Sequence, residues 1–345
     1  MNFTLHKDFS EIDPAAWNTL VEQSIADTPF SRYEYLSEWW KTLGGGEWNA
    51  GADGQAKPPK LVLASATEND QLLGIAPLFI AEYDGQQALM LLGSIEISDY
   101  LDLIVCEADL PRFLSELLDF LGSSHTGHWS AIDWYNLPDS SPTLAALKME
   151  SERIDWNYHE EIYRPTPRIA LNGSFEEYLS RVEKKQRHEI RRKMRRAAES
   201  DLNVRFVVVD KNAEIEKEIN AFFDLMVQDP NKANFLHPAM REQMTVTIRA
   251  AFEGNYLWLA FLEIDGAKVA ASLNFDYKNK LWGYNSGVSR DHMELSPGWV
   301  LLGHVIQWCC ENGRSEFDFM RGDEEYKYRF GGVNKYVMRA RSIRK

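Results

Sequence analysis

The chain has 345 residues, of which 44% are apolar, a proportion that is ordinary for a globular protein and a length sufficient for two domains. Its net charge of −14 argues against a general nucleic-acid-binding protein. Three cysteines without disulfide or metal-ligand spacing, no signal-peptide pattern and no run near the ~20 apolar residues of a membrane span predict a cytoplasmic protein without a transmembrane segment.

Apolar periodicity and turn residues define the elements of the first half of the chain. The expected elements are, in order, helices at 14–21 and 30–43, strands at 60–67, 72–83 and 88–92, a helix at 110–121, a strand at 130–137 and a helix at 142–149. An extended segment at 158–171 follows, because Pro165 and Pro167 forbid a helix there.

The second half repeats this order. After a helix at 174–200 that opens on the capping box Ser174-x-x-Glu177, the expected elements are a strand at 204–209, helices at 213–228 and 238–252, strands at 256–264, 268–277 and 281–288, a helix at 299–312 and a strand at 316–320. In both halves a three-stranded meander precedes a helix and a strand, which indicates a duplicated domain. We therefore predict an α/β (α+β) fold with two similar mixed, mostly antiparallel sheets flanked by helices, in domains 1–157 and 158–345.

The predicted helix at 174–200 carries most of the basic charge. Residues Arg181–Arg196 include nine Lys/Arg and two Glu, a local charge of +7 that leaves −21 for the rest of the chain. Such a patch favours recognition of an anion, a phosphate backbone or an acidic partner, although a solvated helix face has the same composition.

Polar residues that interrupt or follow apolar strands are the candidate site residues. The loop after the last strand offers Arg321, Asp323, Glu324 and Lys327, which could orient an amine or carboxylate and stabilise a charged intermediate, and Asp318 alternates with two apolar rings. A conventional charged surface loop would look similar.

Three other segments add candidates. Asp99 and Asp102 flank Tyr100, and on a strand they would face opposite sides, so one of them could act as a base while the alternative is that both cap turns. Asn285 and Ser286 lie in mid-strand and indicate a bulge or a cavity lining.

The helix start at Ser296-Pro297-Gly298 has Ser as the expected N-cap, with backbone N–H groups that could bind a pyrophosphate. No Gly-x-Ser-x-Gly, Walker, dinucleotide or metal motif occurs, so those enzyme classes are not supported.

Together these segments resemble a known family. The stretch DFMRGDEEYKYRFG (318–331) is similar to the closing signature of FemAB-like GNAT-superfamily acyltransferases, in particular the CelD/BcsL group. The further matching segments are SDYLD (98–102), KQRHEIRRK (185–193), YNSG (284–287) and LSPG (295–298). The resemblance spans nearly the whole chain and implies two tandem GNAT-like domains.

The resemblance also implies an activity, namely transfer of an acyl group, acetyl in the first instance, to an amine or hydroxyl of a small molecule or glycan. Its donor would be acyl-CoA or an acyl carrier protein, with no permanently bound cofactor and no metal. The expected roles are catalytic for Asp102, Asp99, Asp323 and Lys327, substrate-binding for Arg321, Asp318, Glu324, Tyr326, Asn285, Ser286 and Tyr100, and donor-binding for Ser296 and Gly298.

Two alternatives stay open at this point. The sequence has only Gly298 where acyl-CoA enzymes have a Gln/Arg-x-x-Gly-x-Gly/Ala loop, and it lacks the coiled-coil arm of the Fem enzymes. A Fem-like enzyme would use aminoacyl-tRNA, which, like a carrier protein, could bind at Arg181–Arg196. A non-catalytic module with a GNAT-like fold would bind a partner without turnover.

Overall fold

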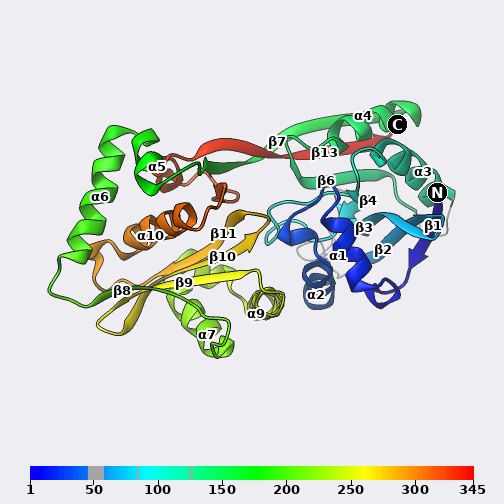
Figure 1. The fold of residues 1–345 in the computed structure, drawn as a ribbon. Helices are drawn as coiled ribbons and strands as arrows, with labels where there is room; N and C mark the ends of the chain where they lie inside the picture. Colours follow the sequence, from blue (N-terminus) through cyan, green and yellow to red (C-terminus); the bar gives the residue numbers. More distant parts are fainter. Residues whose placement is uncertain (46–57, 84, 124–125, 127) are drawn as a thin grey trace. The chain divides into compact units, whose positions relative to one another are not determined.

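The chain divides into two units. A computed structural model describes residues 1–45, 58–83, 85–123, 126 and 128–345, and separates residues 1–165 plus 336–345 from residues 166–335 (Figure 1). This division differs from the predicted boundary at 157/158. The reason is that β7 (Trp156–Ala170) is one uninterrupted strand and that β13 (Val333–Arg344) pairs with a strand of the first unit.

The first unit is built on a mixed, mostly antiparallel sheet. Its remaining strands are β1 (Asn2–His6), β2 (Lys60–Glu68), β3 (Gln71–Tyr83), β4 (Gln86–Leu91), β5 (Ile104–Val105) and β6 (Ala131–Pro138). The order is β1-β2-β3-β4-β6-β13, with β5 beside β3; β4 and β6 run parallel, and the other pairs named here run antiparallel.

Helices cover both faces of this sheet. They are α1 (Pro14–Val21), α2 (Tyr33–Leu43), α3 (Leu110–Ser123) and α4 (Thr143–Arg153). Alternation along β3 separates the two faces: Leu78 joins the core under α3 and α4, whereas the Phe79 ring contacts Trp39 of α2 at 5.7 Å.

The second unit repeats the arrangement. Its strands are β8 (Val204–Val208), β9 (Leu257–Ile264), β10 (Ala267–Tyr277), β11 (Lys280–Val288) and β12 (Glu316–Asp318), together with the end of β7. The order is β8-β9-β10-β11-β12-β7, and only β11 and β12 run parallel. The predicted repeat of meander, helix and strand is therefore confirmed.

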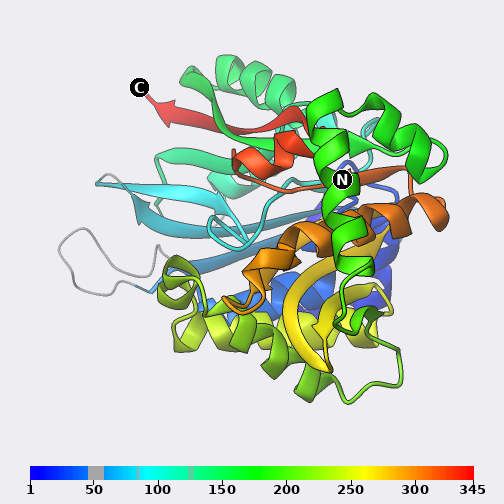
Figure 2. The same ribbon diagram turned by 90° about the vertical axis from the view of Figure 1, so that its left-hand side faces the viewer.

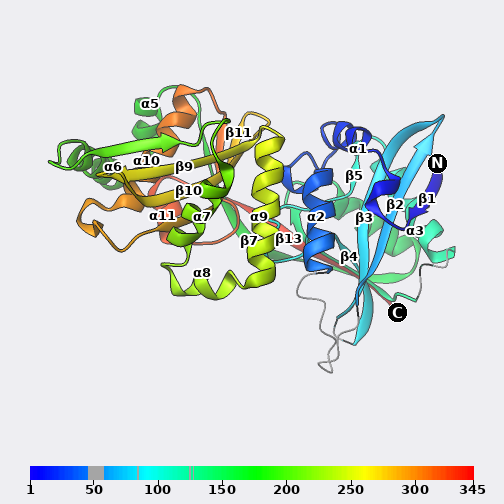
Figure 3. The ribbon, with the colours of Figure 1, turned by 90° about the horizontal axis from the view of Figure 1, so that it is seen from below.

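Two groups of helices sandwich this second sheet. The helices are α5 (Phe175–Arg181), α6 (Lys184–Ala198), α7 (Ile215–Met226), α8 (Pro230–Phe235), α9 (Pro238–Glu253), α10 (Pro297–Glu311) and α11 (Glu325–Arg329). Figure 3 shows α7 and α9 in front of β9 and β10, and Figure 2 shows α6 crossing in front of α10. The Trp258 side chain packs in the core under α6 and α10, and the next side chain, Leu259, is buried on the opposite face of the sheet.

The predicted helix at 174–200 is wrong in one respect, because it is two helices. Val182 is extended (φ −72°, ψ 144°), which ends α5, and α6 begins at Lys184. Both helices bury apolar side chains in the same core, and the Arg187 guanidinium donates to the Ser180 carbonyl oxygen at 3.0 Å, which satisfies the end of α5.

Candidate active site

Strands β11 and β12 separate inside the second unit. They pair only through Lys280–Trp282 of β11, whereas β10 pairs with β11 along its length. From Gly283 to Val288, the β12 side of β11 has no strand partner among the residues that the structure describes. Backbone groups at such an edge need side chains or a ligand as partners.

A bulge lies in this separated part of β11. Leu273 of β10 is opposite Asn285, and the next residue, Asn274, is opposite Gly283, so Tyr284 is the extra residue. The Asn285 side-chain oxygen accepts from the Ser286 N–H at 2.8 Å. Of the two interpretations of the mid-strand polar pair, the bulge is present, and it re-aims the side chains beside it.

Lys232 of α8 reaches this edge and was missed by the sequence analysis. Its ammonium donates to the Ser286 carbonyl oxygen at 2.6 Å and to the Ser286 hydroxyl at 3.1 Å. Burial lowers the pKa of Lys232, while the carboxylates of Asp229 and Glu324 oppose that shift and the Lys327 charge adds to it. The one available signal was the helix start at Asp229-Pro230, which many helices share.

Lys327 holds the loop that follows β12. Its side chain is buried, and Nζ lies 3.2 Å from the Met320 carbonyl oxygen, 2.7 Å from that of Arg321 and 3.4 Å from that of Gly322. It also pairs with the Glu324 carboxylate at 3.0 Å. These partners are all within the loop, so in this structure Lys327 positions the loop rather than presenting its donors to a substrate.

The remaining loop candidates lie around that anchor. Arg321 is half-buried, Asp323 and Glu324 are exposed, and the Tyr326 side chain is 42% exposed. Asp318 is fully buried, pairs with Arg168 at 3.1 Å and accepts from the Met320 N–H at 2.8 Å. Its predicted substrate contact therefore remains a prediction, and its observed partners are structural.

The predicted donor-binding helix start has fewer donors than expected. Ser296 is the N-cap residue but has φ +55° and no side-chain cap bond, and Pro297 has no N–H. The Trp299 and Val300 N–H groups both donate to the Ser296 carbonyl oxygen, at 3.0 and 3.1 Å. A Cβ on Gly298 would lie 2.9 Å from Val288, so this glycine permits α10 to begin against the end of β11.

The other three candidates belong to the first unit and are buried within it. The strand geometry considered for Asp99 and Asp102 is absent, because β5 begins only at Ile104 and both residues lie with Tyr100 in the preceding loop. Asp102 accepts from the Thr143 hydroxyl at 2.6 Å and the Leu103 N–H at 2.8 Å, and also from the Ser141 hydroxyl. Burial raises the pKa of Asp102 to about 6 despite these bonds.

The second unit therefore brings Asn285, Ser286, Glu324 and Lys327 together around Lys232. This arrangement places a partly desolvated cation beside the open edge of a strand, where it can stabilise negative charge. Over the described residues, no group of three or more His, Cys, Asp or Glu side chains is placed to hold a metal ion, and no helix has the length and hydropathy needed to cross a membrane.

Comparisons with known proteins show what this unit is similar to. Residues 184–328 match the acetyltransferase (GNAT) domain family. This match covers the separated strands, Lys232 and the loop up to Lys327. The match lies within the second unit, and the resemblance to FemAB-like GNAT-superfamily acyltransferases expected from the sequence is confirmed.

Solved structures extend the similarity of fold to the whole chain. FemX aligns over 98% of this chain and 97% of its own, with a TM-score of 0.65 and 11% identity. L-PGS from Bacillus licheniformis aligns over 96% and 92%, with a TM-score of 0.54 and 12% identity. The C-terminal domain of a putative lysylphosphatidylglycerol synthetase from Agrobacterium fabrum aligns over 98% of this chain and 92% of its own, with a TM-score of 0.55 and 12% identity. No protein with a curated function matches the sequence.

Proposed function

We propose that this protein transfers an acyl group from a thioester donor, acyl-CoA in the first instance, to an amine or hydroxyl acceptor. The observation that carries the proposal is the GNAT-matched segment, whose β11 edge opens away from β12 beside the Lys232 ammonium. In this reaction the acceptor nitrogen or oxygen attacks the carbonyl carbon, the C–S bond breaks, and the thiolate takes up a proton.

Lys232 is the residue that we place nearest the developing negative charge. A cation held at Ser286 in a half-buried position costs little reorganisation when the tetrahedral oxyanion forms. Asp323 is exposed in the loop that Lys327 anchors, so it is available to accept the acceptor's proton. Asp99 and Asp102 remain alternative bases, and Arg321 and Tyr326 remain substrate contacts under this proposal.

Donor binding is the first test. A ligand at about 100 times its dissociation constant adds about 2.7 kcal/mol to the folded state, which thermal unfolding detects. Free CoA, acetyl-CoA and a longer acyl-CoA are compared, and thiol release is then followed with a panel of amines and hydroxyl compounds. Absence of both a thermal shift and thiol release with every acyl-CoA would rule out this donor.

The Lys232→Met variant tests the site. Loss of one preorganised charge from the oxyanion should lower kcat by roughly 10²–10³, with the fold retained. Lys335→Met, an exposed lysine of the same unit, is the matched control and should keep full activity. Full activity of a folded Lys232→Met protein would remove Lys232 from the reaction.

Aminoacyl transfer from tRNA is the second candidate, favoured by the basic surface of α6 together with the FemX-like fold. Phosphate contacts release counterions, so specific tRNA binding should weaken steeply with salt. It should also disappear on charge reversal of Arg191, Arg192 and Arg195. Binding that is absent or insensitive to salt would exclude this candidate.

A further inference from the structure

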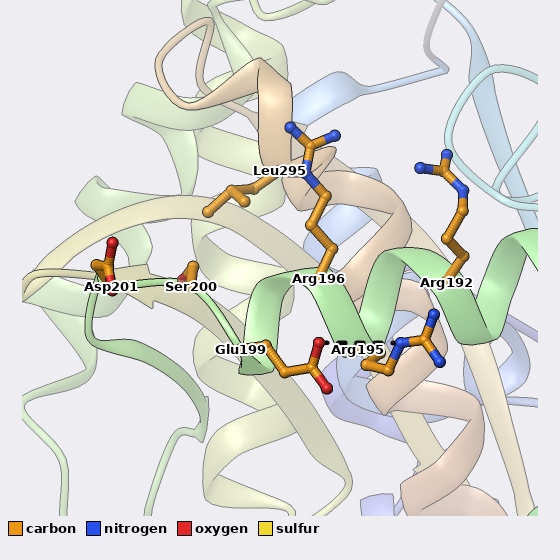
Figure 4. A pocket seen from close by; sticks show the side chains of 7 residues that line it. All are labelled: Arg192, Arg195, Arg196, Glu199, Ser200, Asp201 and Leu295. Carbon is orange, nitrogen blue, oxygen red and sulfur yellow. Dashed lines mark ion pairs between the residues drawn. The ribbon is translucent and has the colours of Figure 1, made fainter.

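A basic pocket lies at the C-terminal end of α6, outside the site described above. Its volume is about 430 Å³, and its lining residues are Arg192, Arg195, Arg196, Glu199, Ser200, Asp201 and Leu295 (Figure 4). Leu295 ends a short 3₁₀ turn and directly precedes Ser296, the first residue of the α10 helix start. The pocket thus adjoins the end of α10 at which the donor is expected.

Two of the three arginines extend from the same side of α6. Arg192 and Arg196 are four residues apart, and Figure 4 shows both rising from one face of the helix, with Arg196 directed toward Leu295. Arg192 is held by Glu189 through two bonds, at 2.9 and 2.8 Å. Arg196 makes no ion pair with any residue in the described part of the chain, so its guanidinium is available to a ligand.

The carboxylates of Glu199 and Asp201 offset the positive charge of the pocket only in part. Arg195 lies 3.9 Å from Glu199, and both side chains are about 70% exposed (70% and 71%), so solvent screens that pair. Three arginines against Glu199 and Asp201 leave a local excess of one positive charge. A compact anionic group can pair with the Arg196 guanidinium, and Arg192, two of whose N–H groups are bound by Glu189, lies one helical turn away.

The pocket is fixed to α10 rather than carried on a free helix. The Lys193 ammonium lies over the Trp299 ring, 4.3 Å from its centroid. A Cβ added to Gly303 would lie 2.7 Å from the Met194 sulfur, so α6 and α10 approach closely there. The α6 backbone that carries the arginines is therefore held in place before a ligand binds, which lowers the entropic cost of binding.

The charge distribution favours a compact anion over a long polyanion. Arg181–Arg196 carries +7, and the rest of the chain carries −21, so an extended acidic partner is repelled beyond this helix. We propose that the pocket binds a terminal phosphate monoester of the acyl donor, the group that CoA carries as its 3′-phosphate. The inference rests on the proposed function, because it gives that donor a second contact.

The test compares CoA with 3′-dephospho-CoA, which lacks only this group. At low salt, calorimetry should show the intact protein binding CoA about tenfold more tightly than dephospho-CoA. In Arg196→Gln this ratio should fall to about one or two. Lys185→Gln removes an equal charge at the other end of α6, roughly 17 Å away along the helix, and should keep the ratio. An unchanged ratio in Arg196→Gln, or an equal fall in Lys185→Gln, would overturn the proposal.

Measurements of binding and turnover together separate this proposal from the proposed function. If acyl-CoA is turned over while CoA and dephospho-CoA bind equally, the function stands and the pocket assignment fails. If adenosine 3′,5′-bisphosphate binds in a way that depends on Arg196 but no acyl-CoA is turned over, the pocket stands and the acyl-CoA assignment fails. If neither CoA nor the bisphosphate binds, both are wrong.

Discussion

Two buried charges in this protein are held mainly by neighbouring polar groups rather than by a single opposite charge. The Lys327 ammonium collects the carbonyl oxygens of residues 320–322, and Asp102 collects hydroxyl and N–H donors within the first unit. A buried charge is tolerated only when its hydrogen-bonding capacity is satisfied. Both residues therefore have a structural role that substitution should reveal apart from any effect on activity.

Lys327→Met should release the loop after β12. The substitution keeps the length of the side chain but leaves the Met320 and Arg321 carbonyl oxygens without their donor, at a cost of roughly 2–4 kcal/mol in the free energy of unfolding. Chemical denaturation measures the loss, and limited proteolysis should cut near residues 320–324. Lys335→Met serves as the control, and equal stability of the two variants would contradict the anchoring role. A folded, fully active Lys327→Ala protein would separately exclude a catalytic role.

Asp102 should make stability depend on pH in an unusual direction. Its folded-state pKa of about 6 lies above the ordinary value of 3.8, so the native state binds more protons than the unfolded state between these values. The contribution of the protonated carboxyl is present below about pH 4 and is lost as pH rises to about 6, a change of up to roughly 3 kcal/mol.

Asp102→Asn removes this titration. The difference in free energy of unfolding between wild type and variant, measured at pH 4 and pH 7 on either side of the pI near 5.1, should therefore fall with rising pH. A difference that does not change with pH would show that Asp102 has an ordinary pKa.

Residue types alone predicted candidate residues but not their contacts. The pattern placed Asn285 and Ser286 in mid-strand correctly, because polar residues stand out in an apolar strand. It could not show that Lys327 faces its own loop or that Asp102 is buried, since both facts depend on segments distant in sequence or on the path of the chain at Met320, which has φ +59°. Lys232 was missed because a single lysine on a short helix carries no periodic signal.

At the scale of elements, glycines set how closely α7 and α10 approach β11 and how closely α6 approaches α10. A Cβ on Gly287 would lie 2.5 Å from the Met226 backbone nitrogen, whereas one on Gly298 would meet the Val288 side chain at 2.9 Å. One on Gly303 would meet the end of a flexible methionine at 2.7 Å. An added methyl group would displace backbone at Gly287, a branched side chain at Gly298 and a flexible side chain at Gly303. The loss in free energy of unfolding should therefore differ among the three positions.

Alanine substitutions should follow that order. Gly287→Ala forces backbone apart and should cost about 3 kcal/mol or more, and Gly298→Ala about 1–3 kcal/mol. Gly303→Ala should be nearly neutral, because the helix gains about 1 kcal/mol from alanine while Met194 shifts. Denaturant titrations measure the three values, and Val288→Ala should restore the Gly298→Ala protein. Equal costs at all three positions would contradict this account.

The order of the two meanders, with the helix and strand that follow each, was predictable, but β1, α8, α11, β13 and the break between α5 and α6 were not. Alternation and turn residues gave both meanders because each strand is apolar on its buried faces. The break between α5 and α6 was not visible, since Val182 and Glu183 fit a continuous helical pattern and the Arg187 contact that satisfies the end of α5 requires the structure. The local signal favoured one helix, and packing of two segments into one core overrode it.

At the scale of the whole molecule, the last strand of the chain completes the sheet of the first unit. β13 pairs with β6 from Val337 to Ile343, and the Arg339 guanidinium forms two bonds with the buried Asp133 carboxylate, at 2.9 and 2.7 Å. The first unit therefore depends on residues that follow the entire second unit in the sequence.

Removal of residues 336–345 should unfold the first unit selectively. It would leave Asp133 buried without its partner and expose the edge of β6, each a substantial loss. Proteolysis followed by mass spectrometry should show cleavage within residues 58–165 and protection of residues 184–328. A synthetic peptide of residues 333–345 added in trans should restore protection, and an unchanged melting temperature of the truncated protein would contradict the prediction.

The path of β13 also sets a sequence of events during synthesis. Residues 166–335 are contiguous, so the second unit has all of its own residues before the final strand leaves the ribosome, and it can fold on the nascent chain. The first unit, although it is translated earlier, must wait with the β6 edge unpaired until residues 336–345 emerge. The part of the protein that is made first is therefore the part that is finished last.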